Sequence, residues 1–366
     1  MKWSFKIARI AGIDVNIHMT FLLLVGFVAV SYWMGGGGPI VIAEGVLYLL
    51  AIFVCVLLHE LGHALTARRF GIQTRDITLL PIGGVARLER MPEKPVQELW
   101  VALAGPAVNL VLALALFAGL LVTQTFQTFS VLSLTSGNFT ERLLAVNLSL
   151  LLFNLIPAFP MDGGRVVRAL LATRLEYTRA TQIAATLGQG LALILGFLGL
   201  FGNPSLLFIA FFVWIGAGQE ASMVQVKSAL SGIPISRAML TEFHTLAPTD
   251  PLSRAVELIL SSSQHDFPVA ADGHVVGILT RKHLIRALSE YKDTTFVSFV
   301  MQKEFKVVDS TQMLEDVAQH IQANEQDIVP VVHDGVLIGL FTLENAGEFL
   351  MIQNAVRARK GINPAL

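Results

Sequence analysis

The sequence predicts an α-helical polytopic membrane protein of about six transmembrane helices, with a small membrane-associated β-hairpin or sheet and a C-terminal α/β domain. Three observations predict this fold. Hydrophobic residues make up 54% of the chain and charged residues only 14%, which is too apolar for an ordinary soluble domain. Long apolar runs fill the first part of the chain. Beyond residue 227 the composition becomes that of a soluble protein and contains an internal repeat.

Six apolar runs are long enough, if helical, to cross the hydrocarbon core of a bilayer, which takes about 20 residues. They lie at 17–35, 39–65, 99–123, 142–161, 181–201 and 204–226. The single cysteine, Cys55, falls within the second run, and we interpret it as a packed core residue. The N-terminus shows no pattern of a cleavable signal peptide.

Lysine and arginine residues fall on alternate loops between these runs. The segments that carry them are 1–16, 66–98 and 162–180. The segments that contain none are 35–39, 124–141 and 202–204. This positive-inside pattern predicts a multi-pass protein of the cell membrane with both termini in the cytoplasm, because a soluble protein with buried helices would not segregate its charges by loop.

The second run contains the string His59-Glu60-Leu61-Gly62-His63. Residues four apart share one face of a helix, so His59 and His63 can place two imidazole nitrogens on one metal ion. Glu60 lies beside them with a carboxylate that can act on water at the metal without being a ligand. HExxH occurs by chance in soluble helices, but ionisable groups at the end of an apolar span are costly unless paired or metallated. The pattern therefore predicts a metal site.

Zinc needs a third protein ligand, and the fourth run ends in a candidate. The string NLIPAFPMDGGR, residues 154–165, places Asp162 at the same predicted membrane face as the histidines. Its two prolines break the helix and its two glycines allow a close turn, so Asp162 can point back into the bundle. The alternative is that Asp162 caps a helix beginning near Gly163. The shared membrane face favours the ligand.

HELGH in one apolar helix and NLIPAFPMDGGR in a later one resemble the motifs of the site-2 protease family, the intramembrane zinc metalloproteases of family M50. The resemblance implies one zinc ion per chain, held by His59, His63 and Asp162, with Glu60 as general base and acid. It implies that Asn154 lies near the metal and holds the substrate backbone or the developing oxyanion. The alternative for Asn154 is an interhelical hydrogen bond.

Residues 73–89 alternate loosely in polarity and contain Pro81-Ile82-Gly83-Gly84. In the family this region forms a small sheet whose edge can pair with an unwound substrate, which makes Gly83 and Gly84 candidate substrate contacts. The alternative is a hairpin turn with no further role. The segment Ala104–Asn109 resembles a family packing motif, in which small residues allow helices to approach closely.

The C-terminal part repeats itself with an offset of 62 residues. PVAADGHVVGILTRKHL begins at Pro268 and PVVHDGVLIGLFTLENA at Pro330; each predicts two strands joined at Asp-Gly and then a helix after Thr. The repeat resembles a tandem CBS domain, as in the site-2 protease branch that includes sporulation factor processing proteases. Such pairs often bind adenine nucleotides, which makes Thr280 and Thr342 candidate contacts. His283 and Asn345 replace the usual acid, so a structural or dimerising role for the CBS pair stays open.

The predicted domains follow from these boundaries. They are the six-span metalloprotease domain 1–226, a linker 227–234, the CBS repeats 235–292 and 293–355, and a tail 356–366.

The sequence thus predicts a zinc-dependent endopeptidase that hydrolyses peptide bonds in or near transmembrane segments of other proteins. Its expected partners are a membrane-protein substrate, the lipid bilayer and, through the CBS pairs, a second copy, but no nucleic acid. The alternative is a metal-binding transporter or channel gated by the CBS pair. A transport pathway would place polar residues along several spans, whereas the polar residues here gather near one membrane face.

Overall fold

The computed structural model describes residues 3–89, 92, 94–123, 138–324 and 328–359. The chain divides into two compact units, Met1–Val224 and Gln225–Leu366, and each is described by itself. Lys2, Arg90 and residues 124–137 of the predicted loop lie outside the described residues, as do residues 360–366 of the predicted tail. The finer domain bounds remain predictions.

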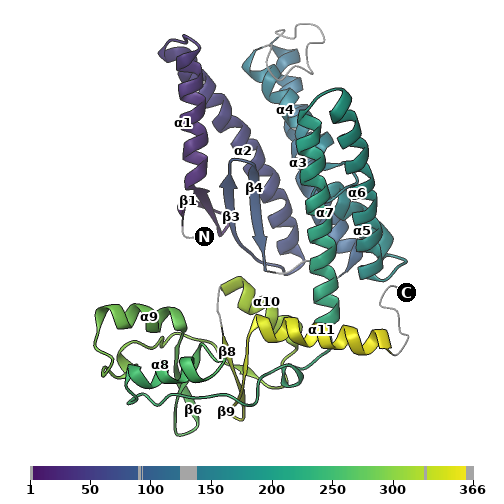
Figure 1. Cartoon of the computed structure of the whole chain (residues 1–366). Coiled ribbons are helices and arrows are strands. Elements are labelled where there is room, and N and C mark those ends of the chain that lie inside the picture. Colours follow the sequence, from purple (N-terminus) through teal and green to yellow (C-terminus); the bar gives the residue numbers. More distant parts are fainter. Residues whose placement is uncertain (1–2, 90–91, 93, 124–137, 325–327, 360–366) are drawn as a thin grey trace. The chain divides into compact units, whose positions relative to one another are not determined.

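The first unit is mainly helical, as the sequence predicts, and its helices run side by side (Figure 1). They are α1 (Met19–Met34), α2 (Pro39–Arg69), α3 (Pro95–Val122), α4 (Phe139–Asn154), α5 (Asp162–Ala172), α6 (Tyr177–Phe201) and α7 (Ser205–Leu230). Within the described residues, four helices are long and apolar enough to cross a membrane: α2, α3, α6 and α7.

The other two predicted spans correspond to shorter helices. α1 and α4 contain 16 residues each, so each is about 24 Å long, against about 30 Å of hydrocarbon. The count of six spans therefore stays a prediction. The fourth apolar run was expected to continue to residue 161, but its helix ends at Asn154, because Pro157 and Pro160 lack the backbone N–H that a longer helix needs.

A four-stranded sheet in the order β1-β2-β3-β4 lies against α2 (Figure 1). The strands are β1 (Ser4–Ile10), β2 (Ile13–His18), β3 (Thr74–Leu80) and β4 (Gly83–Leu88). The sequence predicts the β3–β4 hairpin but not the β1–β2 hairpin. The latter turns at Ala11 and Gly12, whose φ angles are +51° and +85°, and β2 then pairs with β3 in parallel.

The apolar side of this sheet faces the helices. Ile77 of β3 is fully buried with Leu61 and Ala64 of α2, and Leu79 packs with Phe21 and Phe53. This packing holds β4, an edge strand, beside the helix that carries the HExxH motif.

The second unit contains the two repeats. The first comprises α8 (Leu252–Ser261), β5 (Phe267–Ala271), β6 (His274–Leu279) and α9 (Arg281–Glu290). The second comprises β7 (Val308–Asp309), α10 (Leu314–Asn324), β8 (Val329–His333), β9 (Val336–Phe341) and α11 (Leu343–Arg359). The predicted Asp-Gly turns are confirmed: Asp272 and Asp334 have φ angles of +51° and +49°, and the glycine that follows each has a φ of +80°.

Candidate metal centre

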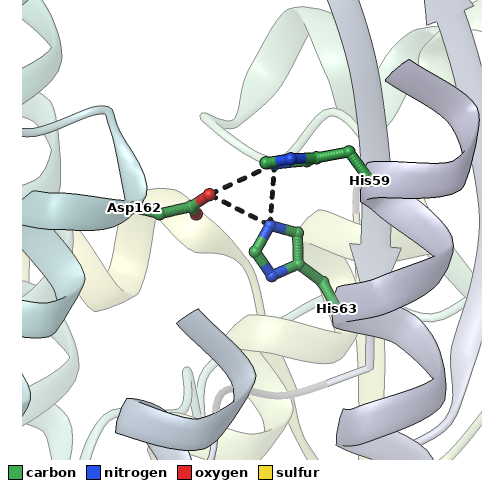
Figure 2. A group of neighbouring side chains, drawn as sticks. All are labelled: His59, His63 and Asp162. Atoms are coloured by element: carbon green, nitrogen blue, oxygen red, sulfur yellow. Dashed lines mark hydrogen bonds and ion pairs between the residues drawn. The ribbon is translucent and has the colours of Figure 1, made fainter. Parts of the chain in front are cut away.

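His59, His63 and Asp162 come together in the interior of the first unit (Figure 2). Both histidines project from α2, and Asp162 is the first residue of α5. Each of the three residues is only 6% exposed. Among the described residues, this is the one cluster of three or more His, Cys, Asp or Glu side chains able to hold a metal ion.

The three donor atoms form a nearly equilateral triangle. His63 Nε2 lies 3.0 Å from His59 Nε2 and 3.0 Å from Asp162 Oδ2, and the third side, from His59 Nε2 to Asp162 Oδ2, is 3.2 Å. A tetrahedral zinc ion with ligands at about 2.0–2.1 Å separates any two of them by about 3.3 Å. The donor set and its spacing therefore fit zinc.

Backbone of α3 fixes the orientation of the second imidazole. His63 Nδ1 lies 2.7 Å from the carbonyl oxygen of Val101. Because a carbonyl can only accept, Nδ1 carries the proton, and the lone pair of Nε2 is left free to bind a metal ion.

The same helix also leaves space for the donor atoms. A Cβ on Gly105 would lie 2.6 Å from His59 Nε2 and would overlap His63 Nε2. The sequence predicts only a packing role for Gly105, and its closeness to the candidate metal ligands is a finding of the structure.

The chain between α4 and α5 is anchored so that Asp162 reaches the histidines. Phe159 is fully buried and packs with Ala184, Ala185 and Ala217 of α6 and α7. α5 begins without a side-chain capping hydrogen bond, after Met161 as N-cap. The carboxylate of Asp162 thus contacts the histidines, and the arrangement favours the ligand over the capping alternative.

Glu60 lies next to the triad, partly buried, with β4 directly against it. A Cβ on Gly84 would lie 2.7 Å from Glu60 Cγ and 3.1 Å from Val56 Cγ1. Only a residue without a side chain lets the strand approach this closely. Gly83, the first residue of β4, has a φ of +139°.

Asn154 is the last residue of α4, and its Nδ2 donates to Leu150 O at 3.0 Å, within its own helix. It lies at the start of the segment that leads to Asp162. The structure records neither the expected contact with the metal site nor an interhelical hydrogen bond for this residue among the described contacts.

In the second unit, Thr280 and Thr342 precede α9 and α11. Thr280 Oγ1 lies 2.7 Å from His283 Nδ1, and Thr342 Oγ1 donates to Asn345 Oδ1 at 2.8 Å. The side chains of the two residues that replace the usual acid therefore pair with the threonine hydroxyls. Each hydroxyl also accepts from the backbone N–H of the same residue, at the start of the helix.

A peptidase that uses zinc within a membrane needs three protein ligands, an adjacent carboxylate and apolar surroundings. This domain has three residues that could bind the metal, a neighbouring glutamate and apolar helices, which is the arrangement of an intramembrane metallopeptidase. The model of peptidase family M50 matches residues 47–143 and 130–195. A zinc metalloprotease of Methanocaldococcus jannaschii is 33% identical over 344 residues, 93% of this chain and 94% of the relative. The chain belongs to peptidase family M50.

Two further proteins are similar to parts of this chain. The stage IV sporulation protein FB of Bacillus subtilis is 30% identical over 161 residues, 43% of this chain and 51% of that protein. The solved site-2 protease of Methanocaldococcus jannaschii is 37% identical, with 60% of this chain and 95% of that chain covered and a TM-score of 0.44. The CBS domain model matches residues 235–290 and 297–348. The relatives favour the peptidase over the transporter or channel.

Proposed function

We propose that the protein is an intramembrane zinc-dependent endopeptidase that hydrolyses peptide bonds in or near the transmembrane segments of other membrane proteins. The observation that carries this proposal is the triangle of donor atoms from His59, His63 and Asp162, with sides of 3.0–3.2 Å. It lies in a unit that has four helices long and apolar enough to span a membrane among the described residues.

In this proposal His59, His63 and Asp162 hold the metal, and Glu60 moves the protons. A zinc ion supplies Lewis-acid chemistry, since it lowers the pKa of water towards neutrality and polarises a carbonyl group. The Glu60 carboxylate accepts a proton from the attacking water and delivers it to the nitrogen of the leaving amine. Val101 holds His63 in the tautomer that this arrangement requires.

The substrate is proposed to bind as an added strand. β4 is an edge strand, and Gly84 brings its backbone against Glu60. An extended peptide paired with β4 at Gly83 and Gly84 would satisfy its backbone groups, which lipid cannot do. Asn154 is proposed to contact the substrate backbone or the oxyanion after exchanging its hydrogen bond to Leu150 O.

The chain is further proposed to lie in the cell membrane with both termini in the cytoplasm and the metal on the cytoplasmic side of the midplane. Cysteines placed at Thr66 and Val166, in a Cys55→Ala background, test this orientation. Both should react with a membrane-impermeant maleimide applied from the cytoplasm. Labelling only from outside would reverse the topology.

For the CBS pair we propose an adenine nucleotide as regulatory ligand, contacted by Thr280 and Thr342. In the two repeats β6 lies close to β9, and Ile278, Ile328 and Leu340 form a shared core. Millimolar ATP, ADP and AMP should each be tested for binding and for a change in cleavage rate of about 5- to 150-fold. If none binds, homo-oligomerisation through the CBS pairs is the remaining proposal, measured by light scattering in detergent.

The experiment that tests the peptidase compares membrane proteins in cells that carry the wild-type protein with those in cells that carry Glu60→Gln. Substrates should accumulate uncleaved only with the variant, because it keeps the metal ligands but loses the proton acceptor. Purified wild-type protein should then cleave the accumulated protein. The proposal would be contradicted if the two kinds of cells had identical membrane proteomes and the purified wild-type protein cleaved none of their membrane proteins.

A further inference from the structure

Arg168 of α5 is the largest side chain that is completely buried in the described residues, at 0% exposure. Its guanidinium donates from Nε and Nη2 to Glu98 Oε1, at 2.7 and 2.5 Å, and from Nη1 to Glu220 Oε1 at 2.6 Å. Its Cζ atom also lies 5.0 Å from the ring centre of Phe159 and 5.1 Å from that of Tyr177. One cation therefore contacts two acids and two aromatic rings.

These partners belong to different elements. Glu98 lies in the first turn of α3, Tyr177 begins α6, and Glu220 lies in α7. α5 itself has only 11 residues, too few for a helix to be stable without tertiary contacts. The contacts of Arg168 thus connect α5 to all three neighbouring helices.

The same contacts join the two parts of the metal site. Asp162 begins α5, six residues before Arg168, which is about 9 Å along the helix. Glu98 precedes Val101 by less than one turn of α3, and Val101 O holds the imidazole of His63. The pair of Arg168 and Glu98 therefore links the helix that presents the aspartate to the helix that orients one histidine.

The chemistry of the pair makes this link specific. An arginine fork donates in fixed directions, whereas a lysine is a single flexible point charge. Removing the cation would leave the buried Glu98 and the partly buried Glu220 with like charge and no counterion, which forces the helices apart or draws water in.

We propose that Arg168 is a positioning residue of the zinc site: by pairing with Glu98 and Glu220 it sets the distance between Asp162 and the two histidines. This inference rests on the proposed zinc site. Arg168 touches neither the metal ligands nor the reacting atoms by any recorded contact, so it acts through α3 and α5. Mutations of such outer partners typically lower metal affinity or activity by about 10- to 100-fold.

The test measures zinc affinity by chelator competition on purified full-length protein in detergent, using only the fraction that elutes as folded. Arg168→Met should weaken zinc binding by about 10- to 100-fold, and Arg168→Lys should recover part of the loss. The matched control is Arg142→Met. Arg142 also stacks on an aromatic ring, with Cζ 3.9 Å from the ring centre of Tyr48, but its contacts do not involve α5, so zinc affinity should stay at the wild-type value.

If Arg168 only stabilises the fold, Arg168→Met should lower the melting temperature and leave the zinc affinity of the folded fraction unchanged. That result would overturn the inference. If Arg168→Met is not recovered folded, Arg168→Lys and Glu220→Gln decide: weaker zinc binding supports the inference, and wild-type affinity in both overturns it. Failure of the wild-type protein itself to bind zinc would instead refute the proposed function.

Discussion

Substituting Gly105 by alanine tests whether the donor triangle is the working site. The added Cβ would lie 2.6 Å from His59 Nε2, where ordinary contacts begin at 3.4 Å, so the atoms must separate by about 0.8 Å. Catalytic constellations tolerate displacements of about 0.5 Å, and a 1 Å misplacement costs about 100-fold in rate. We therefore expect Gly105→Ala to lose about 100-fold in cleavage and to bind zinc more weakly.

The matched control is Gly119→Ala, in the same helix. A Cβ there meets no atom within 4 Å, so the substitution should leave zinc content and cleavage unchanged and can stabilise α3 by up to about 1 kcal/mol. Cleavage is measured on a substrate that accumulates with Glu60→Gln, and zinc by metal analysis of the same samples. Wild-type zinc content and rate in Gly105→Ala would refute the position assigned to the donor atoms.

Three further substitutions separate the roles of the site. Glu60→Gln should keep its zinc and lose about 10²- to 10⁴-fold in cleavage rate, because the proton acceptor is gone; loss of zinc would make Glu60 a ligand instead. Asp162→Ala should lower zinc occupancy by metal analysis, and full zinc with full activity would return Asp162 to a capping role. Gly164→Ala would place a Cβ 2.6 Å from the backbone carbon of Ala158. It should therefore lower the free energy of unfolding by about 1–3 kcal/mol in a denaturant titration and weaken zinc binding, whereas Gly190→Ala, which meets nothing within 4 Å, should do neither.

Local patterns in the sequence predicted much of this arrangement. The i, i+4 spacing of His59 and His63 is visible because a helix has a known period. The end of the helix before Asp162 can be predicted from the sequence because proline cannot continue a helix. The two Asp-Gly turns of the repeats are visible for a similar reason, since that pair favours the positive φ angles that a tight hairpin requires.

The features that the sequence did not reveal depend on distant partners. The β1–β2 hairpin is completed by the parallel pairing of β2 with β3, and no local pattern specifies a partner some 60 residues away. The local signal for this hairpin is the Ala11-Gly12 turn between two segments in which polar and apolar residues alternate. The two acids that pair with Arg168 are 70 and 52 positions away in the chain. The hydrogen bond of His63 goes to a backbone carbonyl, which any residue type at position 101 would provide, so the sequence does not indicate it.

The most direct test of zinc-dependent peptide hydrolysis is a reconstitution titration on the purified protein. Zinc is first removed with a chelator and then added back in steps, while cleavage of the accumulated substrate is followed by mass spectrometry. Cleavage should vanish on removal and return in proportion to added zinc up to about one ion per chain, and His63→Ala should not recover. Cleavage that persists without zinc, or that never appears with it, would contradict the account.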